Sequence, residues 1–236
     1  MSIGWRSSSV SWPLPPGGEG AVTKKRIAVS IEAASKKAFA TAVDWPGWSR
    51  SGKTEELAVH ALADYADRYS PVAKLAGEEF PRTHGLDFEV VERQGGGGGT
   101  EFGVPSNVTK QDRRRVTSAQ ADRLARLVEA AWKTFENVVA GAPEELRKGP
   151  RGGGRNTSKM VAHVVEADEA YAREMGIKLK APIAEVRAAV LEVLRQPSDG
   201  SPIADRRWTH RYAAHRIAWH ALDHAWEIED RTEPAG

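Results

Sequence analysis

The sequence predicts an α+β chain of two bodies, a small N-terminal body made of a β-hairpin and a helix and a C-terminal up-down four-helix bundle. Apolar residues alternate with polar ones across residues 27–43, which is the period of a β-strand. After residue 117, four segments carry apolar residues at intervals of three and four, which is the period of an amphipathic helix. Four such helices joined by short loops favour a bundle.

Low-complexity segments divide the chain. Residues 1–23 are rich in Ser, Gly and Pro and lack a hydrophobic period, so their apolar surface is too small to offset the entropy of ordering. The run of glycines from Gly95 to Gly99 predicts a flexible connector. The boundaries that follow are a disordered tail at 1–23, the N-terminal body at 24–93, a Gly-rich linker at 94–116 and the bundle at 117–232.

The N-terminal body begins with a predicted hairpin. Its two alternating runs, 27–31 and 39–43, are separated by a Ser-Lys-Lys turn. A helix follows, with Thr54 as its N-cap because the hydroxyl can accept a hydrogen bond from the first turn. We expect that helix to end at Pro71 and a late strand to run over 86–91.

The second body is helical throughout. Its first helix carries Leu124, Trp132 and Phe135 on one face and ends near Gly141. The second helix begins after an N-cap-like Asn-Thr-Ser, the third after a proline and the fourth after a Pro-Ser-Asp-Gly turn. They are expected at about 157–171, 183–194 and 205–231.

Composition excludes several classes of protein. The 236 residues contain 34 Lys and Arg against 32 Asp and Glu, which is not the basic excess of a typical nucleic-acid binder. Cysteine is absent, which excludes disulfides, thiol nucleophiles and Cys-ligated metal centres. No apolar run approaches the ~20 residues that span a bilayer. We therefore expect a cytoplasmic protein without a membrane or nucleic-acid partner.

Histidines are concentrated in the second body, and three of them could bind a metal. His220 and His224 are four residues apart, so both rings project from one face of the last helix. His163 lies near the apolar stripe of the second helix, which should face the same core. Three neutral imidazoles leave a fourth coordination position open, as in catalytic sites. The alternative is that His163 is a core residue with its own hydrogen bonds.

Other residues of these helices have expected roles around that site. Glu166, Asp223 and Glu227 are close enough in sequence to orient the metal ligands. His210 and His215 lie off the face that carries the H-x-x-x-H pair, and we expect them at the surface or at a polar rim.

The segment Ser-Lys-Met-Val-Ala-His163-Val-Val-Glu-Ala-Asp and the later Arg-Ile-Ala-Trp-His220-Ala-Leu-Asp-His224 resemble the DinB-like superfamily. The resemblance covers 117–232. It implies a four-helix bundle whose metal site takes one His from the second helix and an H-x-x-x-H pair from the last. It also implies a divalent metal, zinc or nickel in many members, and a tendency to form homodimers. Relatives of this type, with the YfiT-like enzymes, include transferases and isomerases that use mycothiol or bacillithiol and metal-dependent hydrolases.

Residues 47–54 match the phosphate-binding pattern G-x-x-x-x-G-K-T. The preceding strand alternates, whereas a central parallel strand would be continuously apolar. The N-terminal body is also too short for several βαβ units. We interpret the match as chance.

The same region resembles the HicB-like domains of bacterial antitoxins. The residues that carry the likeness are Phe-Ala-Thr-Ala-Val-Asp-Trp45-Pro-Gly-Trp48 and the following Ser-Gly-Lys-Thr-Glu-Glu-Leu-Ala. The family implies a hairpin with a Pro-Gly turn and a capped helix that packs on the sheet. HicB antitoxins commonly continue into a DNA-binding module, where this chain continues into helices. Trp45 and Trp48 could form a partner surface or cover the edge between helix and sheet.

Two functions follow from these expectations. The first is a divalent-metal-dependent DinB-like enzyme, a thiol-dependent transferase or isomerase or a hydrolase, that acts on a small molecule. Because the chain has no Cys, any thiol must come from a low-molecular-weight cofactor or from the substrate. The alternative is a non-catalytic, antitoxin-like interaction protein that binds a protein partner through its N-terminal domain, with the bundle as a scaffold.

Overall fold

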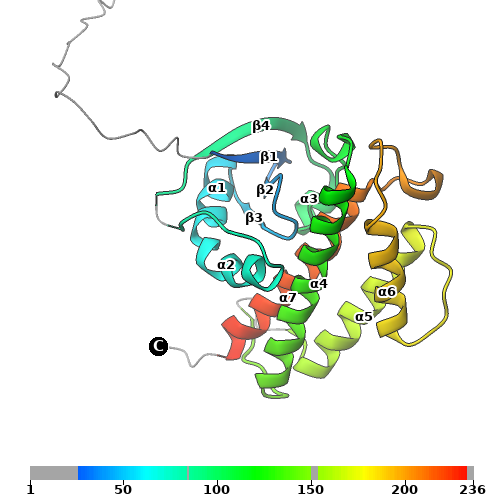
Figure 1. The fold of residues 1–236 in the computed structure, drawn as a ribbon. Helices are drawn as coiled ribbons and strands as arrows, with labels where there is room; N and C mark the ends of the chain where they lie inside the picture. Colours follow the sequence, from blue (N-terminus) through cyan, green and yellow to red (C-terminus); the bar gives the residue numbers. More distant parts are fainter. Residues whose placement is uncertain (1–25, 84, 150–153, 233–236) are drawn as a thin grey trace, which may run out of the picture.

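A computed structural model describes residues 26–83, 85–149 and 154–232. The chain is α+β, with a four-stranded sheet from its N-terminal half and long helices from its C-terminal half, which confirms the predicted fold class at this level (Figure 1). The strands are β1 (Ile27–Ala33), β2 (Ala38–Ala42), β3 (Ser49–Gly52) and β4 (Phe88–Gly95). The helices are α1 (Glu55–Asp64), α2 (Ala66–Leu75), α3 (Gly98–Phe102), α4 (Ser118–Gly141), α5 (Thr157–Glu174), α6 (Ile183–Leu194) and α7 (His210–Thr232).

The sheet has the order β3-β2-β1-β4, and β1 and β2 form the predicted hairpin. β3 is antiparallel to β2, while β4 is parallel to β1 at the opposite edge. The sequence analysis missed β3 because Ser-Arg-Ser-Gly has no apolar alternation. The turn before β3 contains Gly47, whose φ of +91° is a conformation that favours glycine.

Both faces of the sheet are covered. The apolar face, which carries Val29 and Ile31, is buried, and α1 packs on β2 and β3. The opposite face carries polar residues, Ser30 and Glu32, and α7 covers it, so these side chains are buried as well. The alternation along β1 therefore separates apolar residues from polar ones, while on β2 the apolar Phe39 faces α7.

The predicted helix after the hairpin is two helices, and it does not end at Pro71. Thr54 is the N-cap as expected, with its Oγ1 accepting from the Leu57 N–H at 3.2 Å. α2 continues through Pro71 to Leu75, although Pro71 cannot donate to the carbonyl of residue 67. Its buried side chains, among them Tyr69 and Val72, hold the helix against the core and offset the lost hydrogen bond.

The glycine run is not a flexible connector, so that prediction is wrong. Gly95 is the last residue of β4, and α3 begins at Gly98. The cause is the carboxylate of Glu32, which is buried on β1. It accepts hydrogen bonds from the Thr100 hydroxyl and from the backbone N–H groups of Ser106 at 3.1 Å and Asn107 at 3.0 Å. A buried carboxylate requires such donors, so it fixes the segment that supplies them.

The four long helices lie at the predicted places. The side chains of Thr117 and Asn156 cap α4 and α5. α7 begins at His210, later than expected, because Ala204 and Asp205 have φ of 51° and 54° and cannot continue an α-helix. Among the described residues, no helix is long and apolar enough to cross a membrane.

α7 joins the two predicted bodies. In Figure 1 the sheet, α1 and α2 lie on one side of α4 and α7, and α5 and α6 lie on the other. Phe39 of β2 meets Trp219 edge to face with ring centroids 6.1 Å apart, and Arg50 of β3 pairs with Asp223 at 2.8 Å. One continuous apolar core includes residues of the sheet, α1, α2 and all four long helices. The helix that carries the H-x-x-x-H pair is therefore also a wall of the N-terminal half.

Candidate metal centre

Two helices bring three histidines together. His163 comes from α5, and His220 and His224 come from successive turns of α7. One ring nitrogen of each residue lies within 4.8 Å of the others. The Nε2 atoms of His163 and His220 are 3.3 Å apart. The structure thus groups the three residues that the sequence analysis selected, and they could hold a metal ion.

One distance in the cluster fits a divalent metal of the zinc type. Two nitrogens bound at about 2.0–2.1 Å to a tetrahedral ion are separated by about 3.3–3.4 Å. The Nε2 atoms of His163 and His220, which share a hydrogen bond, are 3.3 Å apart. Imidazole ligands suit zinc, nickel, copper and iron, so the ligand set does not select one metal.

His163 and His220 are held in the neutral form that binds metals. Burial, followed by the nearby charges of His224 and Arg216, lowers the pKa of His220 to about 2. Burial and then His224 also lower the pKa of His163. A ring without the extra proton keeps a lone pair for coordination.

Glu227 contacts one of the three histidines, His224. Its Oε2 lies 3.1 Å from Nδ1 of His224, and its Oε1 accepts from Arg231 at 3.1 Å. A proton on Nδ1 of His224 leaves Nε2 free as the ligand atom, which is the usual role of a carboxylate behind a metal-binding histidine. The same role was expected for Asp223 and Glu166, but Asp223 pairs with Arg50 of β3 instead, and Glu166 is exposed.

Two residues that the sequence analysis did not place at the site lie beside it. Tyr171 of α5 stands edge-on to His220, with ring centroids 5.6 Å apart. The guanidinium of Arg216 lies 5.2 Å from the Tyr171 ring centroid and 4.9 Å from that of Trp219. Its Nη1 is buried without an acceptor among the described residues. The sequence feature that could have placed Arg216 beside the site is its spacing, because it lies four residues, one helical turn, before His220.

His215 is not a surface residue, so that prediction is wrong, and His210 is half-buried. His215 is 9% exposed, and its Nε2 lies 3.0 Å from the Val43 carbonyl oxygen. Burial lowers its pKa. The reason is that the N-terminal sheet covers this face of α7, which the helical period alone does not reveal.

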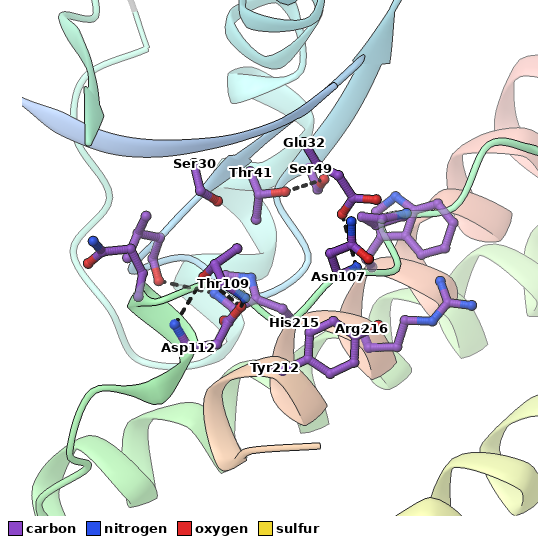
Figure 2. Close-up of a pocket in the computed structure, with 14 residues that line it drawn as sticks. Ser30, Glu32, Thr41, Ser49, Asn107, Thr109, Asp112, Tyr212, His215 and Arg216 are labelled. Carbon is purple, nitrogen blue, oxygen red and sulfur yellow. Dashed lines mark hydrogen bonds between the residues drawn. The ribbon is translucent and has the colours of Figure 1, made fainter. Parts of the chain in front are cut away.

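His215 lines a small cavity between the sheet and α7, whose wall combines polar and apolar side chains (Figure 2). Thr41 and Ser49 from the sheet share a hydrogen bond of 2.7 Å there, and Thr109 donates to Asp112 at 2.7 Å. The cavity volume is about 30 Å³, and a water needs roughly 10–15 Å³. It has room for water but not for an organic substrate.

The residues of the phosphate-loop pattern have other roles. Ser49–Gly52 is a strand paired with β2, and the Thr54 hydroxyl caps α1. A Cβ at Gly52 would lie 2.4 Å from the Ala58 nitrogen, so this glycine permits close contact between β3 and α1. These residues belong to the sheet and its helix cap.

Trp48 covers the junction between the helices and the sheet. It is fully buried, stacks on Tyr69 with ring centroids 5.6 Å apart and donates from Nε1 to the Leu62 carbonyl at 2.9 Å. Trp45 is partly buried and packs against Phe80, with ring centroids 4.9 Å apart. Of the two predicted roles for this pair, the structure supports the packing role for Trp48.

Comparison of the chain with protein families, curated proteins and solved structures gives no match.

Proposed function

We propose that this protein is a divalent-metal-dependent enzyme of the DinB-like type, a transferase, isomerase or hydrolase, in which His163, His220 and His224 bind the metal. The observation that carries the proposal is the convergence of three imidazole nitrogens within 4.8 Å from two separate helices. Three nitrogen ligands leave a position for a substrate atom.

The arrangement of the long helices supports the DinB-like assignment. α4 packs against α7 and α6, and α5 packs against α6 and α7, so each helix has two neighbours in a closed ring. We assign this ring as the four-helix bundle. We assign the hairpin, the turn at Gly47 and the Thr54-capped helix as a HicB-like domain, because α1 packs on β2 and β3.

The chain itself supplies an environment for chemistry at this site. A bound divalent metal would act as a Lewis acid on a thiol, water or carbonyl oxygen. Glu227 holds the His224 ring, and Tyr171 packs against His220. Arg216 adds a positive charge one turn from His220, where it can pair with an anionic group of the bound molecule.

The position of His163 favours the enzyme over the scaffold. A core histidine would be buried, hydrogen-bonded and remote from the H-x-x-x-H pair. His163 is instead partly exposed, and its hydrogen-bond partner, Nε2 of His220 at 3.3 Å, belongs to that pair. An exposed side also gives a substrate access to the centre.

The first test is metal content. Purified wild-type protein, His220→Ala and His60→Ala should be compared by elemental mass spectrometry after exposure to zinc or nickel and removal of free metal. His60 is an exposed histidine on α1, so His60→Ala is a matched control. We expect about one metal per chain in the wild type and the control and little in His220→Ala. Protein that takes up neither metal, or a His220→Ala variant that retains it, would contradict the proposal.

A further inference from the structure

A second cleft lies away from the three histidines, where the sheet meets α4 and α7. It is bounded by the start of β1, the turn after β2, the segment after α2, α4 and the first turn of α7. Its volume is about 530 Å³, within the range of small-molecule sites. None of the three histidines lines it.

An unpaired cation lines this cleft. Arg211 is only 6% exposed. Among the described residues it has no carboxylate partner: its Nη2 donates to the Arg115 carbonyl at a long 3.4 Å, and its Nε is buried without an acceptor. A guanidinium taken out of water without a counter-charge is costly, and buried charges in proteins are normally paired.

The nearest charged groups are already engaged. Asp44 pairs with Arg114 at 3.4 Å, and Asp112 accepts from Thr109 at 2.7 Å. Burial, followed by the charge of Arg114, lowers the pKa of Arg211, and the two carboxylates only partly oppose this. The environment thus disfavours the charged form, and an anionic ligand would supply the missing partner.

The lining of the cleft limits the ligand. Three carboxylates, Asp44, Glu78 and Glu79, line it together with four arginines, Arg26, Arg82, Arg123 and Arg211, so the lining has a net charge that one negative charge neutralises. Arg123 is occupied, since it pairs with Glu78 at 2.6 Å and donates to the Asp44 carbonyl at 2.6 Å. Apolar side chains, Ile27, Phe80 and Leu124 among them, form part of the wall. A single carboxylate on an apolar body matches this combination.

We propose that this cleft binds a small monocarboxylic acid with an apolar body and that Arg211 pairs with its carboxylate. A guanidinium can hold a carboxylate through two parallel hydrogen bonds. In Arg211, Nε has no acceptor among the described residues and Nη2 makes only the long 3.4 Å hydrogen bond to Arg115. The site is separate from the metal centre, so it does not depend on the proposed enzymatic function.

Phenylacetate is a suitable probe. Isothermal titration of the full chain in a buffer without carboxylates should show saturable binding of phenylacetate. Phenylacetamide, which has the same shape without the charge, should bind at least about tenfold more weakly. Phenyl phosphate should also bind more weakly, because its second negative charge exceeds the single net positive charge of the lining. Absence of phenylacetate binding, or equal binding of the amide, would overturn the proposal.

Substitution of Arg211 separates a binding role from a structural one. Arg211→Met keeps most of the side-chain length and removes the unpaired charge. We expect it to lose phenylacetate binding by about tenfold or more, while its melting temperature stays the same or rises. The matched control is Arg207→Met, which removes the same charge from an exposed residue outside the cleft. Undiminished binding, or a melting temperature lowered by several degrees, would assign Arg211 a structural role and reject the proposal.

A second variant tests the proposal without altering the buried arginine. Gln120 lines the cleft, and its side chain accepts from the Thr117 N–H at 3.0 Å in a capping box that glutamate also satisfies. Gln120→Glu should therefore fold normally and weaken phenylacetate binding by charge repulsion, with little effect on phenylacetamide. Unchanged phenylacetate affinity in Gln120→Glu would count against a carboxylate in this cleft. Metal content, measured in the same samples, reports on the other site independently.

Discussion

At the scale of single residues, the candidate metal centre includes a carboxylate that lies behind one of the three histidines. Glu227 connects the His224 ring to Arg231, with distances of 3.1 Å on both sides. Without it, the ring can rotate, and the proton can move to the nitrogen that should coordinate.

Glu227→Ala should therefore weaken zinc binding by about 10–100-fold without abolishing it. Competition with a chromogenic chelator measures this affinity. Glu229→Ala is a suitable control, because Glu229 is nearby on α7 but pairs with Arg68. Equal zinc affinity in the two variants would show that Glu227 does not support His224.

A second residue-scale feature is the buried pair of Asp168 and Arg187, with N–O distances of 2.8 and 2.9 Å. Asp168 is 2% exposed and also accepts from Trp132 at 3.3 Å. Burial raises the pKa of Asp168 to about 6, and the charge of Arg187 opposes this rise. Arg187 is therefore what makes the charged carboxylate tolerable in the core.

Arg187→Met should lower the free energy of unfolding at pH 7 by about 3–5 kcal/mol, because it leaves the carboxylate of Asp168 buried without a counter-charge. Urea unfolding followed by circular dichroism measures the loss. Arg173→Met removes an exposed arginine of α5 and should change stability by no more than about 0.5 kcal/mol. A similarly small loss in Arg187→Met would mean that the pair contributes little.

At the scale of secondary-structure elements, a polar residue of one strand orders a distant segment. Glu32 of β1 accepts from residues more than 60 positions later in the chain. These hydrogen bonds explain why a glycine-rich segment adopts a strand end and a helix instead of a random coil.

Glu32→Gln should loosen this segment. The amide has one acceptor oxygen and introduces donors that face the donors of Ser106 and Asn107. Hydrogen exchange by mass spectrometry should then be faster over residues 96–108. Glu89→Gln, at an exposed position of β4, should leave the exchange rate of this segment unchanged. Unaltered protection in Glu32→Gln would show that packing alone orders the segment.

At the scale of the whole molecule, α7 is shared between the sheet and the helices. Gly47, at the turn before β3, lies so close to α7 that a Cβ on this residue would be 2.7 Å from Cδ1 of Leu222. The positive φ of Gly47 adds backbone strain for any other residue. The shared core predicts that both halves unfold together.

Gly47→Ala should lower the free energy of unfolding by about 1–3 kcal/mol or more, within a single transition. Tryptophan fluorescence and far-ultraviolet circular dichroism should give coincident urea curves for the wild type and the variant. Gly97→Ala is the control, since a Cβ there meets nothing within 4 Å. Separate transitions for the two signals would show that the halves are independent domains.

Local patterns were sufficient for much of this protein. Alternation identified the hairpin of β1 and β2, and helical periods with their caps located α4, α5 and α6. The H-x-x-x-H spacing placed His220 and His224 on one helix face, because residues four apart are neighbours on any α-helix. Each of these features depends on residues close together in the chain, so the sequence by itself determined them.

Other features exist only through contacts between distant residues. β3 has no hydrophobic pattern and is a strand because β2 pairs with it, and α3 is ordered because Glu32 needs hydrogen-bond donors. His215 and Arg211 are polar residues on α7 that are buried because other parts of the chain cover that helix. The cost of burying a polar group depends on which partners surround it, and the identity of those partners is decided by the tertiary structure.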